Sequence, residues 1–267
     1  MLPEKITSAK AKVEWAYEHI KQLQLQRLGF LNTHPYKFTA NYDPQTQELV
    51  YYLIEVRDAP LDMSLTSSDI LHNLRSALDN LVWSFSDPAK RGGRTCFPIY
   101  DPEKTDQASV DGKIEGLCVT GRKIIEDLKP YKGGNELLWQ LHQLNLRDKH
   151  RLLVPVAASL AAFNIGKHTA HVQYGTETLL MRSPKGGFRA RIAQDAYIPP
   201  HCPRCPLKAG DILLVDPPGT KVDKNIDFRF EIAFHEPGII EAEPILKAVY
   251  EMHYAVAEIV GFFAEIP

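Results

Sequence analysis

The residues of this sequence best suited to chemistry lie in the stretch LHQLNLRDKHRLL, residues 141–153. Asp148 is followed there by Lys149, His150 and Arg151, so an acid, two cations and a group that titrates near neutral pH are adjacent. Such a mixture can shift pKa values and move protons. Asp148, His150 and Arg151 are therefore candidates for a catalytic site.

Asp148 also has an unusual position on its predicted helix. At about 100° per residue it shares one helix face with four leucines, Leu137, Leu141, Leu144 and Leu152. An ionised carboxylate on an apolar face is costly unless a cation or water satisfies it. Lys149 and His150 point to other sides of this helix, and Arg151 is not four residues away. We therefore expect the partner of Asp148 to come from another element.

A second predicted helix, residues 69–85, offers that partner. Its face opposite the apolar one carries residues spaced three, four and four apart, namely His72, Arg75, Asp79 and Trp83. We predict that the two helices meet and that Arg75 or His72 neutralises Asp148. Arg75 is favoured because its planar guanidinium can bind a carboxylate with two hydrogen bonds. Buried pairs of this kind commonly fix helix register, so a structural role is favoured over a catalytic one. In the catalytic alternative, His72, Arg75 and Asp79 join Asp148, His150 and Arg151 as candidate site residues.

The elements that must position these residues follow from the periodicity of the apolar residues. Helices are predicted at residues 6–33, 69–85, about 107–129, 135–152 and 239–267. Serine and threonine residues in PLDMSLTSSD are expected to cap the second helix. Two β-rich runs flank the turn DPQTQ and predict a hairpin at about 36–56, and further β-rich runs fill residues 153–235.

This order of elements predicts an α+β fold. Four N-terminal helices and the C-terminal helix would form a helical bundle, with a small β-hairpin and an inserted antiparallel β lobe. The expected regions are 1–152 for the helices and hairpin, 153–238 for the β lobe, and 239–267 for a helix that packs back on the first region. A doubly wound sheet is excluded because helices and strands do not alternate.

Composition restricts the classes of function. A net charge of -2 gives no overall field that would attract nucleic acid or anionic lipid, although a local basic patch stays compatible with it. No run of about 18 apolar residues is present and the first residues lack the apolar core of a signal peptide, so we expect a cytoplasmic protein without a membrane partner. The sequence leaves the oligomeric state open, a homodimer included.

A metal site is suggested by HCPRC, in which Cys202 and Cys205 form a C-x-x-C pair next to His201. Structural zinc needs four ligands, and no second pair of this kind exists. Cys96, Cys118, His168 or His171, or a second chain, would have to complete the site. The alternative is a proline-rich loop with free thiols, and no other cofactor is expected.

Four motifs, LHNLRSALDNLVW, FPIYD, LKPY and DKHRLL, together resemble a widespread bacterial family of uncharacterised proteins. The resemblance runs nearly from end to end and extends to FEIAFHEPG before the last helix. It implies no activity. It does direct attention to the residues within its two polar signatures, His72, Asn73, Arg75, Asp79, Asp148, Lys149, His150 and Arg151.

A looser resemblance is to HEPN helical domains, many of which are metal-independent ribonucleases. Their motif, an Arg, a polar residue and a His after four to six intervening residues, would supply a proton carrier and a phosphate ligand. This sequence departs from it. His150 follows Arg147 too closely, Arg27 and His34 lack the polar residue, and Arg229 and His235 lie in a predicted strand.

Three functions therefore remain. A non-catalytic binding or accessory protein with a structural polar cluster is favoured. The alternatives are a HEPN-like ribonuclease or other nucleic-acid hydrolase, and a zinc-binding protein.

Overall fold

The computed structural model describes residues 2–150, 156–164, 197–198, 205–222 and 226–267. Its contacts divide the chain into two compact units, which are described separately. The helical unit comprises Met1–Leu28, Pro60–Val156 and Glu236–Pro267. The β unit comprises Gly29–Ala59 and Ala157–His235.

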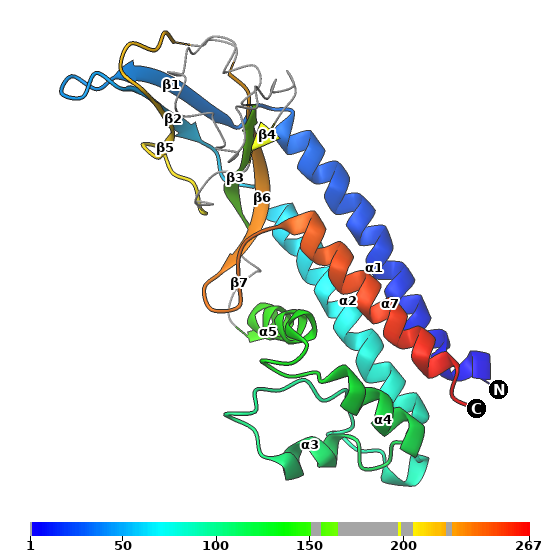
Figure 1. The fold of residues 1–267 in the computed structure, drawn as a ribbon. Helices are drawn as coiled ribbons and strands as arrows, with labels where there is room; N and C mark the ends of the chain where they lie inside the picture. The colour runs from blue at the N-terminus through cyan, green and yellow to red at the C-terminus, as the bar shows by residue number, and fades with distance from the viewer. Residues whose placement is uncertain (1, 151–155, 165–196, 199–204, 223–225) are drawn as a thin grey trace, which may run out of the picture. The chain divides into compact units, whose positions relative to one another are not determined.

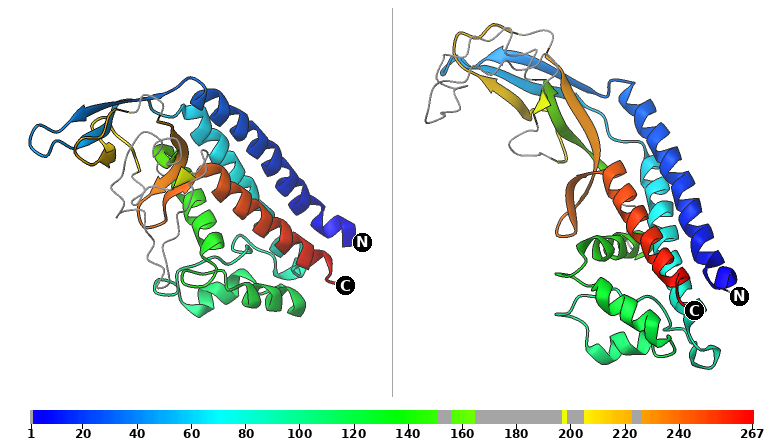
Figure 2. Two further views of the ribbon diagram at one scale, coloured as in Figure 1. Left: turned by 45° about the horizontal axis from the view of Figure 1, so that its top comes forward. Right: turned by 45° about the vertical axis from the view of Figure 1, so that its right-hand side comes forward.

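Three long helices form the helical unit's main layer. They are α1 (Leu2–Leu31), α2 (Leu61–Phe85) and α7 (Ile245–Ala264), and they lie side by side (Figures 1 and 2). Each buries an apolar stripe at helical spacing, for example Ala9, Val13, Ala16, Ile20 and Leu23 on α1. The rings of Phe85 and Phe263 meet with centroids 5.3 Å apart, and this contact joins α2 to α7. The C-terminal helix therefore does pack back on the earlier helices, as the sequence predicted.

The shorter helices are α3 (Gln107–Lys113), α4 (Val119–Leu128) and α5 (Glu136–His150), with a short 3-10 helix at Pro88–Lys90. The α5 helix crosses α2 and packs on both α2 and α7 (Figure 1). The prediction that the helix of residues 135–152 meets the helix of residues 69–85 is thus confirmed.

The prediction of a single helix at 107–129 is wrong, because the structure has two helices there, α3 and α4, separated by a non-helical segment. Asp87 N donates to Gly116 O at 2.8 Å, and a Cβ on Gly116 would lie 2.9 Å from Lys90 Cβ. This close approach to the segment after α2 fixes a turn at 114–116 and an isolated β-bridge between Ser86 and Leu117, where the local sequence favours a helix.

The start of α2 also differs from the prediction. The helix begins at Leu61 after Pro60, so the serines and threonines expected to cap it lie within its first turns. Ser67 Oγ donates to Met63 O at 2.6 Å, four residues back, which satisfies the buried hydroxyl inside the helix.

The β unit contains the hairpin, β1 (Tyr36–Tyr42) and β2 (Leu49–Val56). Asp43 Oδ1 accepts hydrogen bonds from Gln45 N and Thr46 N and so closes the turn. The β2 strand also pairs antiparallel with β5 (Ile212–Asp216), which gives the strand order β1-β2-β5. The hairpin therefore belongs with the later β segment, whereas the expected region 1–152 grouped it with the helices.

The second sheet has the order β4-β3-β6-β7, with β3 at Val156–Asn164, β4 at Tyr197–Ile198, β6 at Phe228–Glu236 and β7 at Ile240–Pro244. The strands expected within 165–196 lie outside the described residues. The β7 strand occupies the start of the region predicted as helix, because Pro244 keeps the residue before it extended and α7 begins only at Ile245. The α+β prediction is confirmed. No helix in the described part of the chain is long and apolar enough to cross a membrane.

Candidate functional site

Arg75 is the centre of a polar cluster between α2 and α5. Its side chain is 7% exposed. Its Nη1 donates to Asp79 Oδ1 at 2.6 Å, its Nη2 to Phe97 O at 2.7 Å and its Nε to His142 Nδ1 at 3.2 Å. We call Arg75, Asp79, Phe97 and His142 the Arg75 cluster. All three guanidinium nitrogens are thus engaged by groups of the protein itself.

Asp79 completes a clamp on the loop that follows α2. Its Oδ1 accepts both from Arg75 and from Phe97 N, the latter at 2.9 Å, while Arg75 holds the carbonyl of the same residue. Both backbone groups of Phe97, a fully buried residue, are therefore fixed by a single turn of α2. The clamp determines where the loop enters the core.

His142 connects the clamp to α5. A guanidinium can only donate, so the Nδ1 that faces Arg75 must carry a lone pair. The geometry therefore assigns the neutral tautomer with its proton on Nε2. His142 lies within the stretch 141–153 but off its leucine stripe, and sequence reasoning missed it. One indication of its role was present in the sequence: His142 lies one helical turn before Asn145 and Leu146, next to the face of α5 that meets α2.

The predicted site residues are only partly brought together. Arg75 and Asp79 join one another, but the acid that pairs with Arg75 is its own helical neighbour. His72 is exposed and lies 3.5 Å from Ser76 Oγ, through its Nε2. Asp148 and His150 lie in the last turn of α5 with side chains outside the described set, and Arg151 lies outside the described residues. The pairing of Asp148 therefore stays a prediction.

Asn73 and Trp83, two other α2 residues in the motif LHNLRSALDNLVW, have structural contacts. Asn73 is buried, donates to Asp69 O at 2.8 Å and accepts from Lys12 Nζ at 3.1 Å, so it links α2 to α1. Trp83 remains 45% exposed, with the Arg91 guanidinium 5.5 Å from its ring centre. The polar face of α2 is thus covered near Arg75 and open at its two ends.

The thiol of Cys96 lies beside the Arg75 cluster. Burial raises the pKa of Cys96, and the negative charge of Asp79 raises it further, while Lys113 and Arg75 oppose this shift. The thiol form is favoured at neutral pH, whereas a catalytic cysteine needs the thiolate.

The metal prediction gains no support from the described residues. Among them, no group of three or more His, Cys, Asp and Glu side chains could hold a metal ion. His201 and Cys202 lie outside them. Cys205 is half-buried, and burial raises the pKa of its thiol to about 11.

The HEPN-type pair Arg229 and His235 does not form one site. Both residues lie on β6, a continuous strand of nine residues. Six residues of strand separate their Cα atoms by about 20 Å. A ribonuclease needs both groups at a single phosphate, so this match to the motif is a coincidence of spacing.

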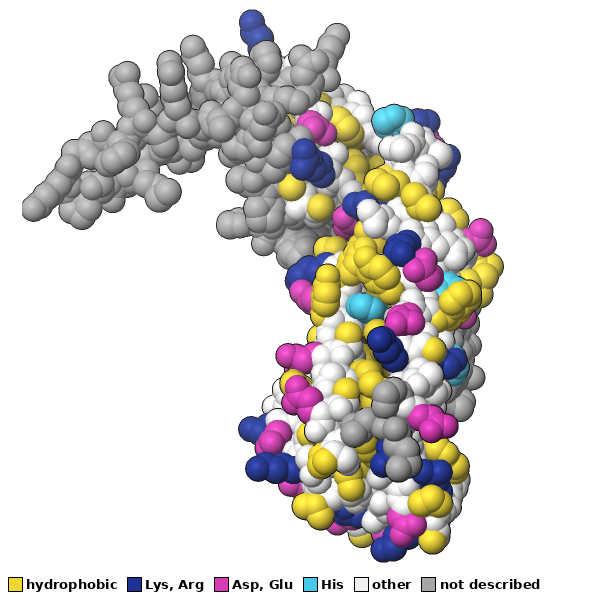
Figure 3. Space-filling model, turned by 90° about the vertical axis from the view of Figure 1, so that its right-hand side faces the viewer, with side chains coloured by type: hydrophobic (Ala, Val, Ile, Leu, Met, Phe, Trp, Pro, Cys, Tyr) yellow, Lys and Arg dark blue, Asp and Glu magenta, His cyan; other side chains and the backbone are white. Residues whose placement is uncertain are grey.

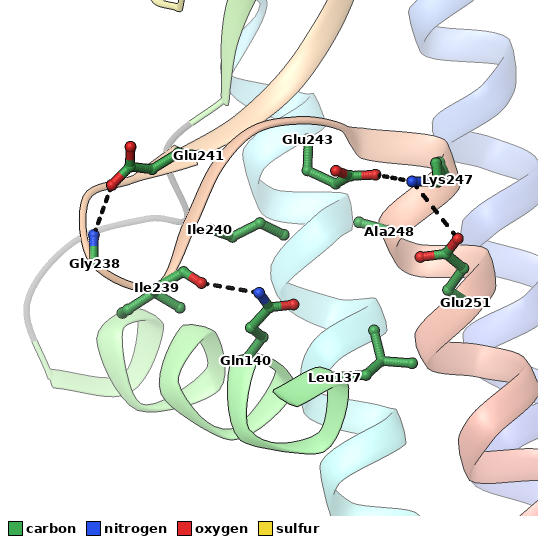
Figure 4. Close-up of a pocket in the computed structure, with 10 residues that line it drawn as sticks. All are labelled: Leu137, Gln140, Gly238, Ile239, Ile240, Glu241, Glu243, Lys247, Ala248 and Glu251. Atoms are coloured by element: carbon green, nitrogen blue, oxygen red, sulfur yellow. Dashed lines mark hydrogen bonds and ion pairs between the residues drawn. The ribbon is translucent and has the colours of Figure 1, made fainter. Parts of the chain in front are cut away.

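A polar pocket of about 380 Å³ lies between α5, the turn before β7 and the start of α7 (Figure 4). Gln140 Nε2 donates to Ile239 O at 3.0 Å. Lys247 Nζ lies 2.6 Å from Glu243 Oε1 and 3.8 Å from Glu251 Oε1. The cation of this pocket is therefore held by two of its own carboxylates.

A larger hollow than this pocket is a groove of about 580 Å³ between α1 and α7. Tyr17 and Tyr254 stand on its two sides and are 39% and 66% exposed. Figure 3 shows hydrophobic side chains interspersed with charged ones on the side of the helical unit where these helices lie. Large exposed aromatic side chains gathered in one place are typical of interaction surfaces.

Comparison of the chain with protein-family models, with curated proteins and with solved structures finds no match.

Proposed function

We propose that this is a non-catalytic binding or accessory protein, whose Arg75 cluster maintains the helical unit and whose binding surface is the groove between α1 and α7. The observation that carries the proposal is that each of the three guanidinium nitrogens of Arg75 donates to the protein itself. A catalytic arginine needs donors directed at substrate. Here Nε, Nη1 and Nη2 each donate to a group of the protein.

The neighbours of Arg75 support the same conclusion. A general base needs an accessible lone pair, but Nδ1 of His142 accepts from Arg75, and its Nε2 carries the proton. A cysteine nucleophile needs a lowered pKa, but that of Cys96 is raised. Neither His142 nor Cys96 is thus available as a base or a nucleophile.

The resemblance to the bacterial family with the two polar signatures stays a prediction beside this proposal. Neither HEPN-type hydrolysis nor zinc binding is favoured by a specific contact in the described part of the chain.

The test measures nuclease activity and thermal unfolding on the same preparations. Single-stranded RNA and DNA substrates are incubated with wild type, His142→Ala, His150→Ala and Arg75→Lys. We expect no hydrolysis by any of them, and lowered unfolding temperatures for His142→Ala and Arg75→Lys. Lys104→Met is the control, because Lys104 is 77% exposed in its ion pair with Asp101 and should leave both readouts unchanged.

Hydrolysis by the wild type that disappears in a variant whose unfolding temperature is preserved would overturn the proposal. Loss at His150→Ala alone would assign the activity to the end of α5. Loss at both His142→Ala and Arg75→Lys would assign it to the Arg75 cluster.

A further inference from the structure

The α7 side of the groove between α1 and α7 allows close approach by another helix. It contains Ala257, Gly261 and Ala264, which are spaced four and three residues apart and so share one face of α7. No atom lies within 4 Å of a Cβ built on Gly261. Packed helix axes lie about 8–10 Å apart, with the shortest separations where the contacting side chains are small.

The walls of the groove are apolar and aromatic. Val13 and Tyr17 line it from α1, and Tyr254 and Val260 line it from α7. The rings of Tyr250 and Tyr254 stack with centroids 6.4 Å apart, which holds the exposed Tyr254 in position. A helix that brings apolar side chains would be desolvated between these walls.

Charged residues follow one edge of the groove at intervals of one helical turn. They are Lys10, Glu14 and Glu18 on α1. Glu18 also lies 2.7 Å from Lys21, but that pair is exposed and holds Glu18 only weakly. Reading along α1, the edge therefore runs from positive to negative.

We propose that the groove binds α1 of a second copy of this chain, antiparallel to the first, in a symmetric dimer. The inference rests on the proposed function, because it names the occupant of the same groove. The charge order carries it: Lys10 and Glu18 are each four residues from Glu14. A two-fold axis near Glu14 places Lys10 opposite the partner subunit's Glu18, and Glu18 opposite the partner subunit's Lys10.

The same symmetry leads to a second prediction, which concerns Glu14. Glu14 faces the partner subunit's Glu14 at the axis, and like charges there oppose association. The arrangement therefore predicts opposite signs for neighbouring substitutions on one helix. Removal of the Glu14 charge tightens the dimer, whereas reversal of Lys10 or of Glu18 weakens it.

The experiment is sedimentation equilibrium of the full chain over a dilution series at low salt, with thermal unfolding as a check of each fold. Lys10→Glu and Glu18→Lys each change two symmetry-related pairs, so each should raise the dimer Kd by about tenfold. The double variant restores opposite charges and should return the Kd to within about threefold of wild type. Glu14→Gln should lower it, and the control Lys104→Glu should not change it.

Wild type that stays monomeric at every concentration would overturn the dimer and leave the non-catalytic proposal standing. A dimer that is not rescued by the double reversal would overturn this arrangement. Nuclease activity would instead contradict the proposed function without bearing on the sedimentation result.

Discussion

The Arg75 cluster and the groove between α1 and α7 are opposites in composition and in use. The cluster contains the residue types from which catalytic sites are built, yet Arg75 is buried and bonded to its own loop and helices. Small, aliphatic and aromatic residues make up most of the groove lining, with charged residues along one edge, and Tyr254 is 66% exposed there. Residue type alone therefore misleads. Whether a group is already satisfied by the protein decides if it is available to a ligand.

The largest test of this comparison is Arg75→Met. The change removes the donor to Phe97 O and to His142 Nδ1 and one of the two donors to Asp79 Oδ1, so it should destabilise the fold by about 2–4 kcal/mol. Urea unfolding followed by circular dichroism measures the loss. A loss below about 1 kcal/mol would mean that the cluster is not structural, because buried acceptors left without a donor cost more than that.

Asp79→Asn should have a smaller effect of about 1–2 kcal/mol in the same measurement. The asparagine oxygen can still accept from Phe97 N, but the charge opposite Arg75 is lost. Asp79 is also 39% exposed, so water replaces part of the interaction. An effect equal to that of Arg75→Met would show that the carboxylate, and not the arginine, organises the loop.

The reactivity of Cys96 reports on the charges of the cluster. With Cys118, Cys202 and Cys205 replaced by serine, alkylation at pH 8 should be several-fold slower in the folded protein than in urea, because burial raises the pKa of Cys96. Asp79→Asn should speed it, since the carboxylate contributes to the same shift. Unchanged rates in both comparisons would place Cys96 in an ordinary exposed environment.

The smallest expected effect lies at the groove. Burial lowers the pKa of His253, opposed by a hydrogen bond to the backbone of Val13. The unfolded chain then binds the proton more readily, so His253 favours the folded state above its unfolded pKa of about 6.5 and weakens it as pH falls through that value. The urea midpoint should fall slightly more between pH 7.5 and 5.5 in wild type than in His253→Asn. If the urea midpoint falls equally in both proteins, His253 does not contribute to the loss of stability at low pH.

The elements with long apolar stripes were predictable from the sequence. The faces of α1, α2 and α7 and the hairpin follow from periodicity and from the DPQTQ turn. The break between α3 and α4 was not, because it depends on the approach of Gly116 to Lys90, which is a tertiary contact. The β7 strand was missed because its residues read equally well as the first turn of α7.

The candidate site was predictable to the level of its central residue. Arg75 and Asp79 were selected from helical spacing, and that spacing also allows the pair they form with each other. His142 and Phe97 could not be selected from the sequence. His142 takes part because its Nδ1, on the neighbouring helix α5, accepts a hydrogen bond from Arg75, and Phe97 takes part through its backbone N–H and C=O groups. Neither property is visible in a residue's type.

The pairing of β2 with β5 has a consequence for synthesis of the protein. The ribosome adds about 150 residues between the end of β2 and the start of β5, which takes roughly 10–30 s at about 5–20 residues per second. During that time the nascent hairpin carries an unpaired strand edge, and such edges recruit other chains. Translation that stalls before residue 212 should therefore yield an aggregation-prone product that needs chaperone protection.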